Sequence, residues 1–314
     1  MENNLIGLIE VASFPAGHFL ENIAVRQDGS LLVTDLSHQK LWYISSFSSS
    51  MTEPIPLFTF DQKAMGIIEA DPDIFYVSTG VPSHGRLYRF DLRGWVPGAT
   101  LVPEIIIDDS RSLGMLNGSC YLGQGVILLA DCFAGSIFRV DLSADGRKGT
   151  LCGWLKHDSM KHNPHGAMPD QPGVNGVRYA ENINYLYYTS TAQQLFMRVA
   201  VDPNTMDAVG EPELVAKGMM ADDFCIDEKN GVAYLTTHRQ NTIDLVSLDP
   251  AENKGPRRSI LGKPVVDLMI GPSAIAWGRA PEDYGRCAYV TTDGGIKAPM
   301  PGGPRPSKIL RMEL

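Results

Sequence analysis

The 314-residue sequence has no apolar run as long as the ~18 residues that a membrane-spanning helix needs. Its first residues also lack the basic segment followed by an apolar core that marks a signal peptide. We therefore expect no membrane partner and a cytoplasmic location. Low-complexity tracts and runs of like charge are absent as well, and 44% of the residues are hydrophobic, so the sequence predicts a folded chain with a large core.

Paired cysteines and an excess of positive charge are also missing. The five cysteines form no CxxC pair and no zinc-binding spacing, and most lie in apolar strand patterns, where a free cysteine acts as a small hydrophobic residue. The chain carries 27 Lys and Arg against 36 Asp and Glu, a formal net charge of −9. Because proteins that bind nucleic acid hold phosphate with basic patches, we expect no nucleic-acid partner.

Common catalytic motifs are absent too. The sequence has no GxSxG nucleophile motif, no Cys and His pair at a catalytic spacing and no phosphate-binding loop. Helical periodicity is nearly absent, which favours an all-β fold.

What the sequence does contain is a repeat. Two β-rich runs joined by a polar turn recur six times, at residues 31–44, 74–90, 126–140, 185–199, 232–246 and 287–312. A shorter apolar run precedes each pair, and these runs start 44, 52, 58, 47 and 51 residues apart at Glu21, Met65, Asn117, Asn175, Asp222 and Ser273. A weaker fourth run follows several copies. Four strands in each unit of about 50 residues predict a six-bladed β-propeller with four antiparallel strands per blade.

The two ends of the chain predict how the ring closes. The last unit lacks its fourth strand, and the opening strand at residues 7–14 has no blade of its own. We expect this N-terminal strand to become the outer strand of the last blade, because closure removes the exposed sheet edges. Residues 1–314 would then form a single propeller domain. A β-sandwich is the main alternative, and the six matched units argue against it.

The first strand of each blade lines the central channel of a propeller, so the six start positions should meet near one mouth. Four of them carry a carboxylate or an amide group whose oxygen can ligate a hard cation, namely Glu21, Asn117, Asn175 and Asp222. Two carboxylates and two amide carbonyls around one axis form a suitable ligand set for Ca²⁺, whereas zinc or copper would require softer ligands. Asn-Gly and Asp-Asp are also ordinary turn residues, so a purely structural role stays open for each position.

The segments LENIAV, LNGSCY, VNGVRY and ADDFCID, in this order and spacing, resemble the SMP-30/gluconolactonase/luciferin-regenerating-enzyme-like family over nearly the whole chain. In that family a Glu, two Asn and an Asp at these strand starts hold a divalent cation, usually calcium. The resemblance implies that the metal ligands are Glu21, Asn117, Asn175 and Asp222. It also implies a lactonase or esterase in which the cation polarises a carbonyl or phosphoryl oxygen.

The sequence departs from the lactonase pattern around two of these ligands. Asn22 and Ile23 stand where the lactonases have Gly-Pro, and the segment 221–224, ADDF, replaces a Pro-Asp-Gly signature. These variants, together with GPSAIAWGR and YVTTDGG near the C-terminus, resemble a fungal subgroup that includes the hetero-Diels–Alderases of tropolonic sesquiterpene biosynthesis. That resemblance implies a pericyclase of secondary metabolism that requires no cofactor.

Methionine is frequent, with 13 residues, and many of them flank positions expected to line the channel. Because methionine adapts to irregular apolar shapes, a Met-rich mouth favours a large hydrophobic ligand over a sugar lactone, although methionine also fills gaps in ordinary cores. The residues expected to bind substrate are Met65, Met115, Asn117, Asn175, Met219, Met220, Phe224 and Ser273.

The loops between the second and third strands should reach the same mouth, and one of them carries His238 and Arg239. A histidine there can exchange a proton near neutral pH, and an arginine can stabilise negative charge on a substrate oxygen. We name His238, Arg239 and Asp222 as the candidate catalytic residues.

Two hypotheses for the function follow. The first, which the resemblance to the fungal subgroup favours, is a fungal enzyme of secondary metabolism that cyclises a hydrophobic terpenoid or polyketide by a hetero-Diels–Alder-type reaction, mainly through proximity and orientation. The second is a Ca²⁺-dependent lactonase or esterase. In both cases we expect a hydrophobic small molecule as partner and a monomeric protein. The longest insertion, residues 155–173, is expected to form a lid over the pocket and contains His157, His162 and His165.

Overall fold

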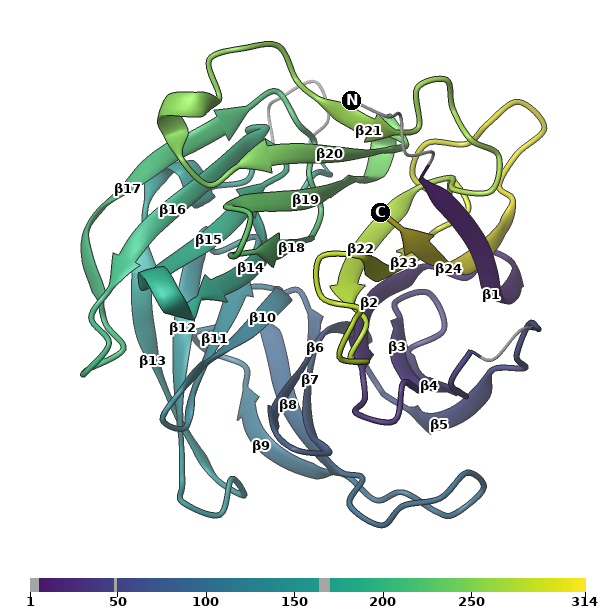
Figure 1. Ribbon diagram of the computed structural model, residues 1–314. Helices are drawn as coiled ribbons and strands as arrows, with labels where there is room; N and C mark the ends of the chain where they lie inside the picture. The colour runs from purple at the N-terminus through teal and green to yellow at the C-terminus, as the bar shows by residue number, and fades with distance from the viewer. Residues whose placement is uncertain (1–5, 48–49, 164–169) are drawn as a thin grey trace.

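The computed structural model of the chain describes residues 6–47, 50–163 and 170–314, and it confirms the predicted fold. Six four-stranded antiparallel sheets are arranged as blades around a central channel (Figure 1). The helices of the described residues are short 3₁₀ turns, and none of them is long and apolar enough to cross a membrane.

Blades 1 to 3 follow one another along the chain. Blade 1 consists of β2 (Leu20–Val25), β3 (Leu31–Asp35), β4 (Lys40–Ile44) and β5 (Ile55–Thr59). Blade 2 consists of β6 (Lys63–Asp71), β7 (Ile74–Val81), β8 (His84–Asp91) and β9 (Glu104–Asp109). Blade 3 consists of β10 (Leu116–Gly123), β11 (Val126–Asp131), β12 (Ser136–Leu142) and β13 (Gly149–Lys156).

Blades 4 to 6 complete the ring. Blade 4 consists of β14 (Val174–Ala180), β15 (Tyr185–Ser190), β16 (Leu195–Val201) and β17 (Ala208–Lys217). Blade 5 consists of β18 (Phe224–Asp227), β19 (Val232–Thr237), β20 (Thr242–Ser247) and β21 (Ser259–Leu261). Blade 6 consists of β22 (Pro272–Trp277), β23 (Cys287–Thr292), β24 (Pro306–Glu313) and β1 (Gly7–Ala16).

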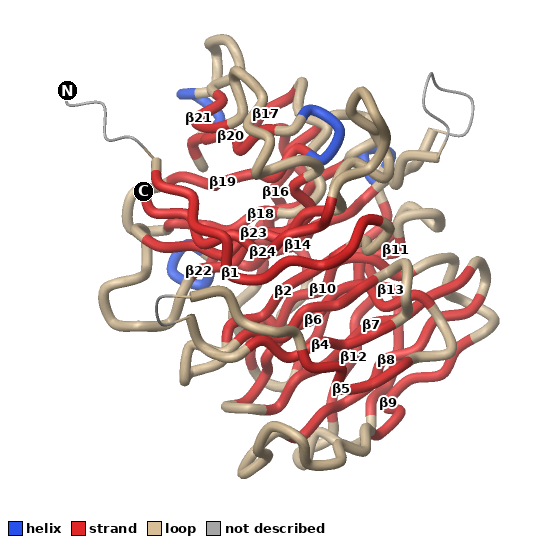
Figure 2. The backbone as a smooth tube through the Cα atoms, turned by 90° about the vertical axis from the view of Figure 1, so that its right-hand side faces the viewer, coloured by secondary structure: helices blue, strands red, loops and turns tan. Residues whose placement is uncertain are grey.

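The N-terminal strand closes the ring, as predicted. β1 pairs antiparallel with β24, from Gly7 opposite Glu313 to Ala16 opposite Pro306, and forms the outer edge of blade 6. The two strands lie side by side in Figures 1 and 2. Residues from the two ends of the chain therefore share one sheet, and hydrogen bonds across this seam hold the last blade together.

The second strand of each blade explains why the sequence shows continuous apolar runs. Every residue of β3, β11 and β23 is buried, because both faces of a blade pack against its neighbours. The outer strands, such as β5 and β17, are mostly half-buried or exposed. Burial thus falls from the channel toward the rim.

Six hydrophobic clusters fill the six interfaces between adjacent blades. Between blades 4 and 5, Phe196 packs edge-on against Phe224 with ring centroids 5.0 Å apart. Between blades 6 and 1, Val11 and Phe14 of the closing strand pack in the same cluster as Ile23. Packing as well as hydrogen bonding therefore anchors β1.

Glycines allow the first strands to approach one another around the channel. A Cβ atom on Gly118 would overlap the backbone oxygen of Asn175 in the next blade, and one on Gly176 would lie 2.6 Å from Oδ1 of Asp223. Gly118 lies inside β10 and Gly176 inside β14. The alternative that these Asn-Gly pairs are turn residues is therefore wrong.

Candidate functional site

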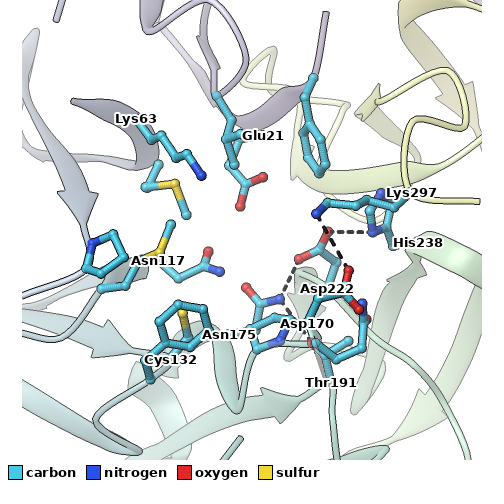
Figure 3. Close-up of a pocket in the computed structure, with 18 residues that line it drawn as sticks. Glu21, Lys63, Asn117, Cys132, Asp170, Asn175, Thr191, Asp222, His238 and Lys297 are labelled. Carbon is cyan, nitrogen blue, oxygen red and sulfur yellow. Dashed lines mark hydrogen bonds and ion pairs between the residues drawn. The ribbon is translucent and has the colours of Figure 1, made fainter. Parts of the chain in front are cut away.

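A cavity of about 270 Å³ lies at the end of the channel where the first strands begin. The four predicted oxygen donors all line it, although they come from four different blades (Figure 3): Glu21, Asn117, Asn175 and Asp222. Three of them lie near the starts of their strands, in β2, β10 and β14, and Asp222 precedes β18 by two residues. The repeat therefore brings the predicted quartet together.

Asp222 is held in place by backbone hydrogen bonds. Its N–H donates to the carbonyl oxygen of Thr236 at 2.8 Å, and its own carbonyl accepts from the Thr189 hydroxyl at 2.7 Å and the Gly176 N–H at 3.0 Å. These bonds fix the irregular segment before β18, so the carboxylate points into the cavity without belonging to a strand.

Asn175 orients the neighbouring carboxylate. Its Nδ2 donates to Oδ1 of Asp222 at 2.6 Å and to the Thr191 hydroxyl at 3.0 Å. Both amide hydrogens are thereby used on one side of the group. The amide oxygen is left facing the centre of the cavity, toward which Glu21 and Asn117 also point (Figure 3).

The Glu21 carboxyl group is only 6% exposed, and within the described part of the chain it makes no hydrogen bond or ion pair (Figure 3). Burial raises its pKa to about 8, and the negative charges of Asp223 and Asp293 add to this effect. Lys297 and Lys63 act in the opposite direction. Without a positive partner in contact, the charged form of this group is disfavoured.

Asp222 is subject to the same forces. Burial raises the pKa of Asp222 well above its ordinary value, and the charge of Glu21 raises it further, while His238 and the hydrogen bond from Asn175 lower it. Two buried carboxyl groups thus disfavour each other's ionisation in one cavity.

His238 lies on the cavity wall between two carboxylates. Its Nε2 is 2.9 Å from Oδ2 of Asp293, and its Nδ1 is 3.8 Å from Oδ2 of Asp222. Burial alone would lower the pKa of His238, but the hydrogen bond to Asp293 and the charges of both aspartates raise it above its ordinary value. Asp293 is itself anchored by the N–H groups of Gly295 at 2.6 Å and Lys297 at 3.1 Å. His238 is therefore held in a fixed orientation, and both aspartates favour its protonated form.

These residues fit a hard divalent cation such as Ca²⁺. The quartet offers two carboxylates and two amide oxygens from four directions around one centre, and it has no thiolate or imidazole ligand of the kind that zinc prefers. A bound cation would supply the partner that the buried Glu21 carboxyl lacks. It would also offset the repulsion between the Glu21 and Asp222 carboxylates.

Methionines and aromatic residues form the apolar wall of the cavity, as expected for two of the predicted substrate contacts. Met65 and Met115 line it beside Phe19, Leu36 and Phe133. These side chains cover the part of the wall contributed mainly by blades 1 to 3.

The structure places the other four predicted substrate contacts away from this wall. Met219 and Phe224 pack in the hydrophobic cluster between blades 4 and 5. Met220 is buried, and its N–H donates to Oε1 of Gln240 at 3.0 Å. Ser273 is fully buried and bonds the Leu20 carbonyl and the Thr291 hydroxyl. Residues at or beside the strand starts therefore do not all face the cavity. Met219 and Phe224 pack in the hydrophobic core between two blades, and Ser273 is held by hydrogen bonds.

Arg239 also lies off the cavity wall. Its guanidinium donates to Oδ2 of Asp170 at 2.8 Å, and Asp170 rather than Arg239 lines the cavity. The arginine therefore positions a carboxylate at the mouth and has no place beside the quartet.

Several cavity residues were not identified from the sequence. Lys63, Thr191, Asp170 and Lys297 line the cavity, and Asp293 supports His238 from behind. Part of this set is identifiable from the sequence, because Thr191, His238 and Asp293 occupy the same position in their repeats. Each directly follows the second strand of its blade, which ends in Thr-Ser or Thr-Thr.

A second group of ligand-type side chains lies in blade 1 and its seam with blade 6. His18, Asp35 and His38 have donor atoms within 4.8 Å of one another. The two imidazole rings are stacked with centroids 3.8 Å apart and planes 19° apart, and both Nδ1 atoms face Oδ2 of Asp35. Nearly parallel rings cannot direct both in-plane lone pairs at one ion, so this arrangement serves as a hydrogen-bonded clip between the β1–β2 connection and the β3–β4 turn.

The long insertion is described only in part. His157 caps the short helix Asp158–Met160, and the His162 ring lies 5.2 Å from that of Phe133 on the cavity wall. The remaining residues of the predicted lid, 164–169 with His165, lie outside the described residues.

No family model matches the sequence, and no curated protein matches it either. The structure is similar to a luciferin-regenerating enzyme, with a TM-score of 0.65 and 14% identity over 99% of this chain and 95% of that one. It is similar to a gluconolactonase from Xanthomonas campestris, with a TM-score of 0.65 and 13% identity over 98% of this chain and 89% of that one. It is also similar to the calcium-binding protein regucalcin from Agrobacterium tumefaciens, with a TM-score of 0.59 and 14% identity over 97% of both chains. At this identity the likeness is one of fold, and the chain has the six-bladed propeller that these proteins share.

Proposed function

We propose that the cavity is the active site of a hydrolase that requires a divalent cation, with Ca²⁺ the best-suited ion, and that cleaves lactones or esters with an apolar body. The observation that carries this proposal is the convergence of four oxygen donors from four blades on one centre, including a buried Glu21 carboxyl without a partner among the described residues. The names of the similar structures, a gluconolactonase and a calcium-binding protein, agree with it.

Glu21, Asn117, Asn175 and Asp222 are the residues that would hold the cation. A bound cation of this kind polarises the carbonyl oxygen of an ester and lowers the pKa of a water molecule. The chain's own contribution is to hold the donors in place, and the hydrogen bonds of Asn175 and of the Asp222 backbone fix two of the four.

His238 supplies a proton at the cavity wall. The hydrogen bond to Asp293 and the charges of Asp293 and Asp222 raise the pKa of His238 above its ordinary value, and Asp293 fixes the ring orientation. A proton-bearing group at this place can protonate the alkoxide that leaves when an ester or lactone bond breaks. The wall of Met65, Met115 and Phe19 excludes water from the other side and binds the apolar part of the substrate.

A second candidate function is the hetero-Diels–Alder-type cyclisation favoured by the sequence, and a different observation supports it. Lys63, Lys297 and His238 surround the two carboxyl groups with positive charge that belongs to the chain itself. In this case Glu21 would stay protonated and donate a hydrogen bond to a carbonyl oxygen of the substrate, while the apolar wall holds the reacting partners.

Ester hydrolysis with and without a chelator tests the proposal. We expect the purified protein to hydrolyse nitrophenyl esters or aliphatic lactones in calcium and to lose this activity in a strong chelator. Glu21→Gln and Asp222→Asn should be inactive in both conditions. The matched control is Glu69→Gln, because Glu69 pairs with Arg279 at the opposite end of the first strands and does not line the cavity.

Hydrolysis that continues unchanged in chelator would contradict a role for the cation. A terpenoid cyclisation that proceeds equally well in chelator, with no ester hydrolysis, would favour the second candidate instead.

A further inference from the structure

Two lysines, from the blades on either side of blade 1, reach into the same cavity. Lys63 begins β6 in blade 2, and Lys297 follows β23 in blade 6. Figure 3 shows both ammonium groups directed toward the cavity, on either side of the Glu21 carboxyl. Both influence the ionisation of Glu21, which agrees with their position beside it.

Neither lysine is closely paired with an acidic side chain in the part of the chain that the structure describes. Among the described residues the Lys63 side chain has no hydrogen bond or ion pair (Figure 3). Lys297 has one acidic neighbour, Asp170, at 3.7 Å, which is beyond hydrogen-bonding distance. Asp170 is engaged more closely by Arg239, at 2.8 Å.

Two other acidic side chains near the lysines have partners of their own. Asp222 accepts from Asn175 and faces His238, and Asp293 is bonded to His238. Among the described residues neither of them, nor Glu21, forms an ion pair with Lys63 or Lys297, so both ammonium groups are available to a ligand.

The surroundings define what kind of anion fits. Lys63 stands beside the apolar wall of Met65, Pro82 and Met115, and its own aliphatic stem extends that wall. A small inorganic anion would leave this apolar surface unused. An anionic head on a hydrophobic body would use both features.

We propose that Lys63 and Lys297 form a subsite for a carboxylate, and that the ligand of this cavity is a hydrophobic molecule bearing a carboxylate. The inference deepens the proposed function and rests on it for the substrate class, because it takes the same cavity as the active site: the substrates are esters or lactones that carry a carboxylate. Binding of a carboxylate at the subsite itself depends neither on the cation nor on the reaction.

Direct binding measurements test the subsite. The ligands are a series of phenylalkanoates of increasing chain length, each paired with the corresponding uncharged amide, titrated by calorimetry in the presence of a strong chelator. For the wild-type protein we expect the acid to bind about tenfold more tightly than its amide, as charge-assisted hydrogen bonds allow.

Substitution of the lysines should remove this preference. Lys63→Met and Lys297→Met keep the apolar stem and should each weaken binding of the acid about three- to tenfold, while the double variant should bind acid and amide alike. Lys63→Arg should retain the preference, because it retains the charge. The matched control is Lys217→Met, at the exposed end of the outer strand β17, which should change nothing.

The proposal is overturned if the double variant still prefers the acid, if the wild-type protein binds acid and amide equally, or if none of the acids binds. Its failure is separable from that of the proposed function. Binding of acids in chelator without any cation-dependent hydrolysis would support the subsite and refute the hydrolase, and the reverse result would do the opposite.

Discussion

Replacing Glu21 with glutamine should stabilise the cation-free protein, and the gain should grow with pH. The pKa of Glu21 is about 8 in the folded protein against an ordinary value of 4.5, so the folded state binds a proton that the unfolded state has lost. The stability that this proton provides is complete below pH 4.5 and is lost progressively up to pH 8. Glutamine mimics the protonated form at every pH and therefore avoids the loss.

The size of the effect follows from the same values. At pH 7 the gap of 2.5 units above the ordinary pKa corresponds to about 3 kcal/mol of unfolding free energy, at 1.36 kcal/mol per unit. For a chain of 314 residues this is roughly a 5 °C rise in melting temperature. Near pH 4.5 and below, the difference should vanish.

The assay is thermal unfolding of wild type and Glu21→Gln in a strong chelator across this pH range, with Glu69→Gln as control. Added calcium should reverse the order, because an ion that binds only the folded wild type stabilises it by mass action and the variant lacks a ligand. An equal gain at pH 5 and pH 8, or a loss in chelator, would refute the reasoning about Glu21.

Three further predictions concern the site and the fold. Asp293→Asn should lower kcat for ester hydrolysis about tenfold or more with little change in KM, because His238 loses the carboxylate that orients its ring and raises its pKa. An unchanged kcat would exclude His238 as proton donor. Gly118→Ala should lower the unfolding free energy in urea by about 1–3 kcal/mol, since the new Cβ meets the Asn175 backbone, and an unchanged midpoint would contradict this contact. Deletion of residues 1–16 should expose the edge of β24 and cause aggregation, and a synthetic peptide of residues 7–16 should prevent this aggregation. A deletion variant that unfolds like the wild type would show that β1 does not close the ring.

The sequence was sufficient to predict the architecture because the repeat carries it. Runs of similar pattern recur at nearly constant spacing, and each run can bury its two faces only against copies of itself. The closing strand was predictable for the same reason, since one blade lacked a strand and one strand lacked a blade. Residues at the same position in each repeat lie at the same level around the channel. The first-strand positions therefore predict the quartet of Glu21, Asn117, Asn175 and Asp222.

The rest of the site could not be read in this way. Met219 and Phe224 flank the same strand start as Asp222, but the local path of the chain before β18 turns them into the interface of blades 4 and 5. Lys63 and Lys297 reach the cavity through long flexible side chains from positions without an apolar pattern. Their contribution depends on which neighbouring carboxylates already have partners, and that information exists only in three dimensions.

One repeat position contributes to the cavity in three successive blades. The residue that follows the second strand is Thr191 in blade 4, His238 in blade 5 and Asp293 in blade 6, and all three belong to the polar network of the cavity. Only His238 was predicted, because histidine carries obvious proton chemistry and the other two resemble ordinary strand ends.

Calorimetric titration of the chelator-stripped protein with Ca²⁺ tests the central claim most directly. The proposal of a cation-dependent active site predicts one bound ion per chain for the wild type and for Glu69→Gln, and none for Glu21→Gln or Asp222→Asn. If the wild type binds no calcium at millimolar concentration, or if Glu21→Gln binds it as tightly as the wild type, the quartet does not hold this cation and the hydrolase proposal is contradicted.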